Sequence, residues 1–134
     1  MSAEARVQEA LLSVLKVDAG VSAIFGGRIY DDESEAPAYP FVRLERHECR
    51  PAGASLGEAT EHVLTLAVSS RDGGLREARQ ALAALRRAVD AAPWALPEGR
   101  IALVHTIYSD AMRQADRRAF RGVIRFRIIS EETT

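Results

Sequence analysis

The sequence predicts an α+β fold in which four main antiparallel strands form a sheet that carries two principal helices on one face. Two segments support this prediction most clearly. Residues 60–70 alternate apolar side chains as a β-strand does, and residues 75–91 repeat them at the spacing of an amphipathic helix. The whole chain reads helix, short strand, strand, strand, helix, strand, strand, an order that predicts helices packed on one face of an antiparallel sheet.

The first helix is expected over residues 3–16, because apolar residues recur at helical spacing from Val7 onward. Asp18 can cap a further short helical piece, and Gly26-Gly27 ends it. The second principal helix is expected to bury a stripe of five apolar residues: Leu75, Ala78, Leu82, Leu85 and Val89. With 134 residues, the chain is long enough for one core, so we expect a single domain over residues 1–134.

The remaining segments are expected to be strands and connections. In chain order they are a short extended segment at 28–30, an acidic loop at 31–39, strands at 41–49 and 60–70 joined by a connection at 50–59, and strands at 101–108 and 120–129 joined by a polar, basic connection at 109–119. The strands at 41–49 and 60–70 are expected to form an antiparallel hairpin. Residues 101–108 carry apolar side chains on both faces, which is typical of a central strand.

Composition excludes several classes of protein. The formal net charge is −1 with 28% charged residues, whereas a dedicated nucleic-acid binder is usually clearly basic. Cys49 is the only cysteine, which excludes an intrachain disulfide. The N-terminus lacks the apolar stretch of a signal peptide, and no apolar run reaches the roughly 20 residues that span a bilayer. We therefore expect a chain that is made in the cytoplasm and has no membrane partner.

Only one set of residues could indicate a metal site: His47, Cys49, His62 and His105. A hairpin could bring His62 near His47 and Cys49, yet the spacings match no standard zinc pattern. The same residues could be a nucleophile and its base, but nothing in the sequence indicates a base or an oxyanion pocket for Cys49. The sequence therefore predicts no catalytic, cofactor-binding or metal-binding residue, and a protein that is not an enzyme.

A glycine-containing segment and an acidic segment are candidates for contacts with a partner. Arg71-Asp72-Gly73-Gly74 precedes a helix, but it has neither the lysine nor the glycine spacing of a phosphate-binding P-loop, and a tight turn explains it. The acidic loop lacks the spacing of an EF-hand, so it is either solvated or a partner for the arginines of a neighbouring subunit. The acidic candidates are Asp31, Asp32 and Glu33.

The densest basic patch lies near the end of the chain. It consists of Arg113, Arg117, Arg118 and Arg121. Two interpretations stay open: a solvated hairpin tip, or a surface that faces another subunit or DNA. The candidate contact residues of the whole chain are thus Arg71, Asp72, Arg113, Arg117, Arg118, Arg121, Asp31, Asp32 and Glu33.

The chain resembles a family of small phage tail-completion, or tail-terminator, proteins that also occurs in phage-like gene transfer agents. Four blocks carry the resemblance in the expected order: Gly26-Gly27-Arg28-Ile29-Tyr30-Asp31, Pro40-Phe41-Val42, His62 through Ala78, and Gly122-Val123-Ile124-Arg125-Phe126-Arg127. One position departs from the pattern, since Ser69 stands where the family often carries an aromatic residue.

The resemblance implies a structural virion protein that forms a ring, expected to be a hexamer, at the head-proximal end of the tail tube. Such a ring stops polymerisation of the tube and joins the tail to the neck. Its partners would be further copies of itself, the tail tube protein, the neck or stopper protein of the head–tail connector, and double-stranded DNA, which passes through the lumen without sequence-specific binding. The connections at 50–59 and 109–119 are candidates for docking the neck or the tube. The alternative is a small α+β binding or regulatory module without catalytic activity.

Overall fold

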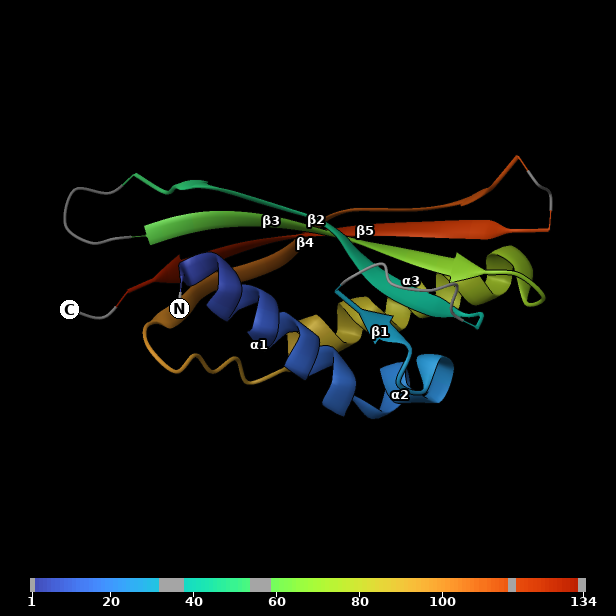
Figure 1. Ribbon diagram of the computed structural model, residues 1–134, viewed down its shortest axis with the longest axis horizontal. Helices are drawn as coiled ribbons and strands as arrows, with labels where there is room; N and C mark the ends of the chain where they lie inside the picture. Colours follow the sequence, from blue (N-terminus) through green and yellow to red (C-terminus); the bar gives the residue numbers. More distant parts are fainter. Residues whose placement is uncertain (1, 32–37, 54–58, 116–117, 133–134) are drawn as a thin grey trace.

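The computed structural model describes residues 2–31, 38–53, 59–115 and 118–132. These residues form two layers, a five-stranded sheet and three helices that cover one of its faces (Figure 1). In chain order the elements are α1 (Ala3–Val17), α2 (Ala19–Phe25), β1 (Ile29–Tyr30), β2 (Phe41–Pro51), β3 (Ala59–Ser70), α3 (Gly74–Ala91), β4 (Arg100–Arg113) and β5 (Phe120–Glu131). The predicted fold class and order of elements are confirmed.

Local sequence signals set the helix ends. Ser2 caps α1 by accepting a hydrogen bond from the backbone N–H of Ala5 at 3.1 Å, and Asp18 caps α2 by accepting from Val21 N–H at 2.9 Å. α2 ends at Gly26, whose φ of +65° is a left-handed conformation that glycine adopts without strain. The short helix after Asp18 was therefore predicted correctly.

The strand order is β1-β2-β3-β5-β4. All neighbouring strands are antiparallel except β1 and β2, which form a short parallel pair. The prediction that residues 101–108 form a central strand was wrong, because β4 lies at the edge of the sheet. The apolar residues on its two faces have different surroundings. Val104 and Ala111 pack on the core, whereas Tyr108 is exposed.

The strands also extend further than their apolar patterns predicted. β4 continues through Arg113, which pairs with Phe120, so residues 109–113 are strand rather than connection. β2 likewise runs to Pro51, and β3 begins at Ala59. The residues in these extensions are exposed or half-buried, and several are polar, so they lack the alternation that marks a half-buried strand.

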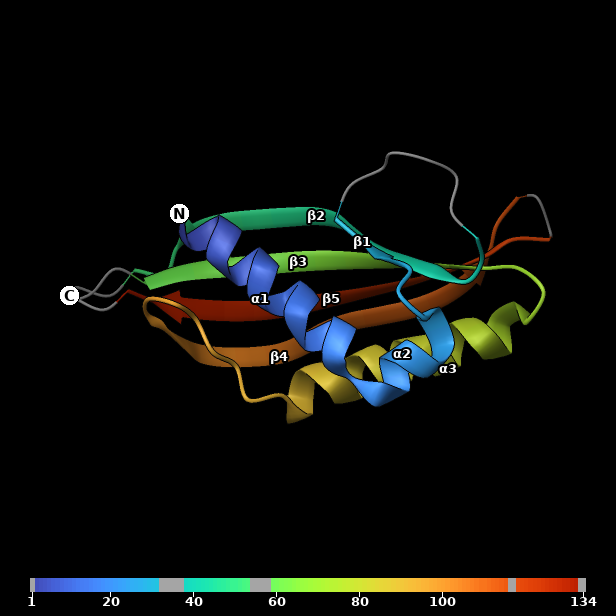
Figure 2. The same ribbon diagram turned by 60° about the horizontal axis from the view of Figure 1, so that its bottom comes forward.

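The core lies between the helices and the inner face of the sheet. α3 packs against β3, β4 and β5, while α1 spans from β1 and β2 to α3 (Figure 2). The largest fully buried side chains of this layer include Phe25, Leu64, Leu66, Leu85 and Phe126. The predicted stripe of α3 is buried except at its first residue, Leu75, which is half-buried beside the opening turn of the helix.

No helix within the described ranges is both long enough and apolar enough to cross a membrane.

Candidate functional site

The sheet face opposite the helices carries arginines and glutamates on neighbouring strands. Glu61 on β3 accepts hydrogen bonds from the guanidinium groups of Arg50 on β2 and Arg127 on β5, the latter at 2.7 Å. These hydrogen bonds, first from Arg50 and then from Arg127, hold the pKa of Glu61 below its usual range. One carboxylate therefore links three adjacent strands on this open face.

Two further pairs extend the pattern toward the ends of the sheet. One guanidinium nitrogen of Arg121 on β5 lies 2.6 Å from both carboxylate oxygens of Glu45 on β2, and Arg100 on β4 lies 2.6 Å from Glu131 on β5. The candidate Arg121 therefore already forms an ion pair with a carboxylate of its own chain. These pairs are partly exposed, so each contributes little stability by itself, but together they order the arginines into fixed positions.

Three other candidate arginines gather at one end of the sheet, which we call the arginine end and define as Arg71, Arg113 and Arg118. The strand register places them there, because Arg71 follows Ser70, which pairs with Phe120, which in turn pairs with Arg113. This end lies at the right of Figure 1, where β4 ends and β5 begins.

The charges of the arginine end are not neutralised by the described part of the chain. Arg71 lies over the ring of Tyr39 at 4.9 Å and Arg113 over the ring of Phe120 at 5.9 Å, as cation–π contacts. No ion pair joins Arg71, Arg113 or Arg118 to a carboxylate within the described ranges. The end can therefore offer guanidinium groups to an acidic partner.

The remaining candidates are distributed differently. Asp72 lies in the turn between β3 and α3, which Gly74 closes with φ of +65°, and α3 has no side-chain cap there. The segment is thus the tight turn that the sequence predicted. Asp31 lies beside α1 and forms no ion pair with a described arginine. Asp32, Glu33 and Arg117 lie outside the described residues.

The edge strand β4 exposes apolar side chains, of which Ile107 and Tyr108 were predicted to lie in a central strand and Met112 in a connection. Ile107, Tyr108 and Met112 are 45%, 42% and 37% exposed. The register shifts twice along β4, which leaves Ala102 and Ile107 without a partner on β5. Edge strands of monomeric proteins are usually protected by charge or cover, so the exposed apolar residues make β4 a candidate contact surface.

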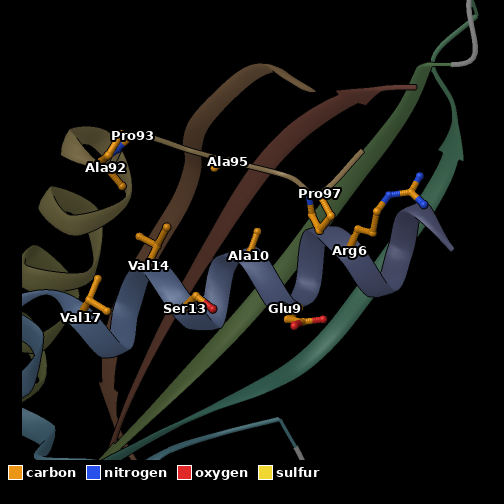
Figure 3. Close-up of a pocket in the computed structure, with 10 residues that line it drawn as sticks. All are labelled: Arg6, Glu9, Ala10, Ser13, Val14, Val17, Ala92, Pro93, Ala95 and Pro97. Atoms are coloured by element: carbon orange, nitrogen blue, oxygen red, sulfur yellow. The ribbon is translucent and has the colours of Figure 1, made fainter. Parts of the chain in front are cut away.

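A groove of about 380 Å³ lies between α1 and the segment that joins α3 to β4 (Figure 3). Figure 3 shows that the two sides approach from segments distant in sequence, which explains why sequence patterns did not reveal it. Its lining residues are Arg6, Glu9, Ala10, Ser13, Val14, Val17, Ala92, Pro93, Ala95 and Pro97. These residues include no histidine or cysteine, and they offer no nucleophile paired with a base.

The β2–β3 hairpin brings His47, Cys49 and His62 together beneath the start of α1. His47 Nε2 lies 2.8 Å from His62 Nδ1, and Cys49 Sγ lies 3.4 Å from the same nitrogen. His105, which the sequence grouped with them, is exposed on β4, a strand that does not adjoin β2 or the hairpin. The structure therefore assembles three of the four residues considered for a metal.

The ionisation of this cluster is unsuited to nucleophilic catalysis. Burial lowers the pKa of His47, and burial together with the charge of His47 lowers the pKa of His62 to about 4. Burial and the neighbouring carboxylate of Glu4 raise the pKa of the Cys49 thiol to about 11. A thiol with so high a pKa is a poor nucleophile at neutral pH, since the thiolate is the reactive form.

Comparison with known proteins assigns a context to these surfaces. The sequence matches the family described as tail completion protein gp17 over residues 9–131. Eighteen chains of solved structures match this chain. One of them, from the virion of a native gene transfer agent particle, superimposes with a TM-score of 0.86 and is 26% identical, and the alignment covers 98% of this chain and 99% of that chain. No curated protein matches the sequence.

Proposed function

The chain belongs to the tail completion protein gp17 family, and from this premise we propose that it completes the tail of a phage or phage-like gene transfer agent as a closed ring of six copies. The observation that carries the proposal is the match over residues 9–131, which includes all of the sheet and α3. The similarity to a chain of a gene transfer agent virion over nearly the full length of both chains supports it.

The proposed mechanism is geometric. The ring sits at the head-proximal end of the tail tube, and one of its faces copies the interface between tube subunits. The other face does not, so no further tube subunit can add and polymerisation stops. That second face binds the neck or stopper protein of the head–tail connector. A ring of identical subunits requires a heterologous interface, in which two different surfaces of the chain meet.

The edge strand β4 is the first surface that we assign to the interface between neighbours. Its exposed Ile107, Tyr108 and Met112 supply apolar contact area. Because two register shifts interrupt the strand, we expect the neighbour to contact its side chains rather than to add a continuous strand. The arginine end is the second surface, since its guanidinium groups can pair with carboxylates of a neighbour and fix the register of the ring.

The two hairpin tips support separate contacts along the tail. The residues that flank the β2–β3 connection and those that flank the β4–β5 connection lie at opposite ends of the sheet (Figure 1). We propose that one tip contacts the tube and the other contacts the neck. The near-neutral charge of the chain suits a lumen through which DNA passes, since a strongly cationic bore would retain the DNA.

Electron microscopy of particles from a producing strain that lacks this gene tests the proposal. We expect overlong tails without heads beside DNA-filled heads without tails. A plasmid copy of the gene should restore complete particles with tails of normal length. Normal particles from the deletion strain would reject the terminator role and favour the small binding module as the remaining alternative.

A further inference from the structure

We propose that His47, Cys49 and His62, completed by Glu4, form a binding site for one tetrahedral zinc ion that joins α1 to the β2–β3 hairpin. No such site follows from the family match, and the inference does not depend on the proposed function. It revises the expectation from the sequence, in which the spacing of these residues matched no zinc pattern. The sequence does not show which face of β2 carries His47 and Cys49, because an irregularity in this strand determines it.

The irregularity is a β-bulge at Glu45. The register of β2 against β3 shifts between Leu44 and Arg46, so no residue of β3 pairs with Glu45 in the sheet. Since side chains alternate between the faces of a strand, one extra residue reverses the alternation beyond it. As a result His47 and Cys49 face the helices on the same side as His62, instead of facing the open side of the sheet.

The distances within the cluster are close to those of a zinc site. One possible ligand atom each from His47, Cys49 and His62 lies within 4.8 Å of the others. Zn–N bonds of about 2.0 Å and Zn–S bonds of about 2.3 Å imply tetrahedral edges of about 3.3 Å between nitrogens and about 3.5 Å between nitrogen and sulfur. The observed distances are 2.8 Å for His47 Nε2 to His62 Nδ1 and 3.4 Å for Cys49 Sγ to His62 Nδ1. To admit the ion, the two rings need to separate by about half an ångström, and the ligand atoms of His47 and Cys49, which lie within 4.8 Å of each other, need to come to about 3.5 Å.

Outer hydrogen bonds orient both rings for metal binding. His62 Nε2 lies 2.8 Å from Ser130 Oγ, and His47 Nδ1 lies 3.3 Å from Gln8 Oε1. When these outer nitrogens carry the ring protons and donate them to the oxygens, the inner nitrogens present two lone pairs to the same point. Partners of this kind accompany almost all zinc-bound histidines. At 2.8 Å, either a ring proton or a metal ion must lie between the two inner nitrogens.

The remaining ligands make the set chemically suited to zinc. Glu4 Oε2 lies 3.7 Å from Cys49 Sγ and supplies a carboxylate from the first turn of α1. Two imidazoles, a thiolate and a carboxylate favour zinc over magnesium or calcium, which prefer oxygen ligands. His62 is buried while Cys49 is exposed, so the site is closed on one side and accessible on the other. Binding converts the Cys49 thiol to a zinc-bound thiolate and releases its proton to solvent.

Calorimetric titration of the full chain with Zn²⁺ alone, after dialysis against a chelator and removal of the chelator, tests the site. We expect one equivalent to bind. Cys49→Ala should weaken zinc binding at least about 100-fold, and Ser130→Ala, which removes an outer partner, about 10- to 100-fold. His105→Gln is the matched control, because it removes an exposed histidine outside the cluster and should leave affinity unchanged. Co²⁺ should give the charge-transfer absorption of a cobalt–thiolate bond in the wild type and not in Cys49→Ala.

Two results would overturn the proposal: no stoichiometric binding by the wild type, or equal binding by the wild type and Cys49→Ala. Either would leave the cluster as a hydrogen-bonded network in which the rings share a proton. Loss of fold does not confound the test, because Cys49 is exposed and circular dichroism in the presence of chelator checks each variant. The cobalt spectrum of the wild type needs no variant at all. A deletion strain with normal particles would reject the tail-completion proposal and leave this result unaffected.

Discussion

Glu61 illustrates how single residues organise the open face of the sheet. Its side chain is only 8% exposed, yet it carries a charge between Arg50 and Arg127. A covered carboxylate is tolerated when charge-assisted hydrogen bonds satisfy its oxygens, and here each oxygen accepts one from a different strand. The residue therefore fixes the positions of two arginines that would otherwise move freely in solvent.

Replacing Glu61 with Gln should lower the urea midpoint of unfolding at pH 7, because the two arginines lose their common acceptor charge. The arginines lower the pKa of Glu61 in the folded state, so its contribution is complete above the unfolded pKa and is lost as pH falls through the folded pKa. The difference between wild type and Glu61→Gln should therefore shrink in acid. Glu9→Gln, at an exposed position of α1, should show no comparable change. Parallel pH profiles for wild type and Glu61→Gln would contradict the assignment.

Gly99 is required by backbone geometry at the turn into β4. Its φ is +86°, and a Cβ there would collide with the carbonyl oxygen of Glu131. Gly99→Ala should therefore lower the free energy of unfolding by about 1–3 kcal/mol. Gly27→Ala is a suitable control, since nothing lies within 4 Å of a Cβ at that position. Urea denaturation measures both, and equal stabilities would show that the turn relaxes to accommodate a side chain.

At the scale of elements, the sequence predicts best where one face is buried and the other is not. The α3 stripe and the inward side chains of β5, such as Phe126 and Ile128, show regular periodicity, and the structure confirms both elements. Apolar side chains on both faces of residues 101–108 predicted a central position for β4. One face packs on the core, but the other is free in the single chain, and a sequence does not distinguish burial in a core from burial by a partner.

The candidate sites were harder to predict because they depend on register. The arginine end follows from strand pairing over more than 40 residues, since Arg71 and Arg113 lie at the same end of the sheet only when both β3 and β4 pair with β5. The cluster around His62 depends on the bulge at Glu45, which the residue types of β2 do not predict. Whether a bulge forms depends on the folded sheet as a whole. The face of β2 that carries His47 could therefore not be predicted from alternation along this strand alone.

The exposed edge of β4 leads to a prediction about self-association. Ile107→Glu combined with Met112→Glu should raise the dissociation constant between copies of the chain at least about tenfold, because buried apolar contacts at an interface contribute 1 kcal/mol or more each. Both side chains are exposed, so the variant should fold normally. Val17→Glu, at an 83% exposed apolar residue of α1, is the control. Analytical ultracentrifugation measures all three chains. Unchanged association of the double variant would remove β4 from the interface.

At the scale of the whole molecule, the two kinds of surface adjoin on one sheet. The exposed apolar residues lie along β4, and Arg113, the last residue of that strand, belongs to the arginine end beside Met112. A ring needs two different patches on each subunit, because a patch that meets itself produces only a dimer. In the ring that we propose, the two adjoining surfaces therefore act as one patch, which meets a different surface of the neighbouring subunit.

The arginine end should consequently control assembly without controlling folding. Arg113→Glu combined with Arg118→Glu reverses two charges that have no carboxylate partner in the described ranges. The monomer loses only the weak contact of Arg113 with the Phe120 ring, so it should unfold at nearly the same urea concentration as the wild type. Ring formation, measured by native mass spectrometry, should be lost, because the reversed charges would repel the carboxylates of a neighbour. Lys16→Glu combined with Arg87→Glu makes the same change of charge at exposed positions of α1 and α3 and should leave ring formation intact. If both pairs of substitutions weakened assembly equally, the effect would come from net charge rather than from this end of the sheet. If neither pair of substitutions weakened assembly, Arg113 and Arg118 would be solvated side chains, and β4 would have to set the register of the ring.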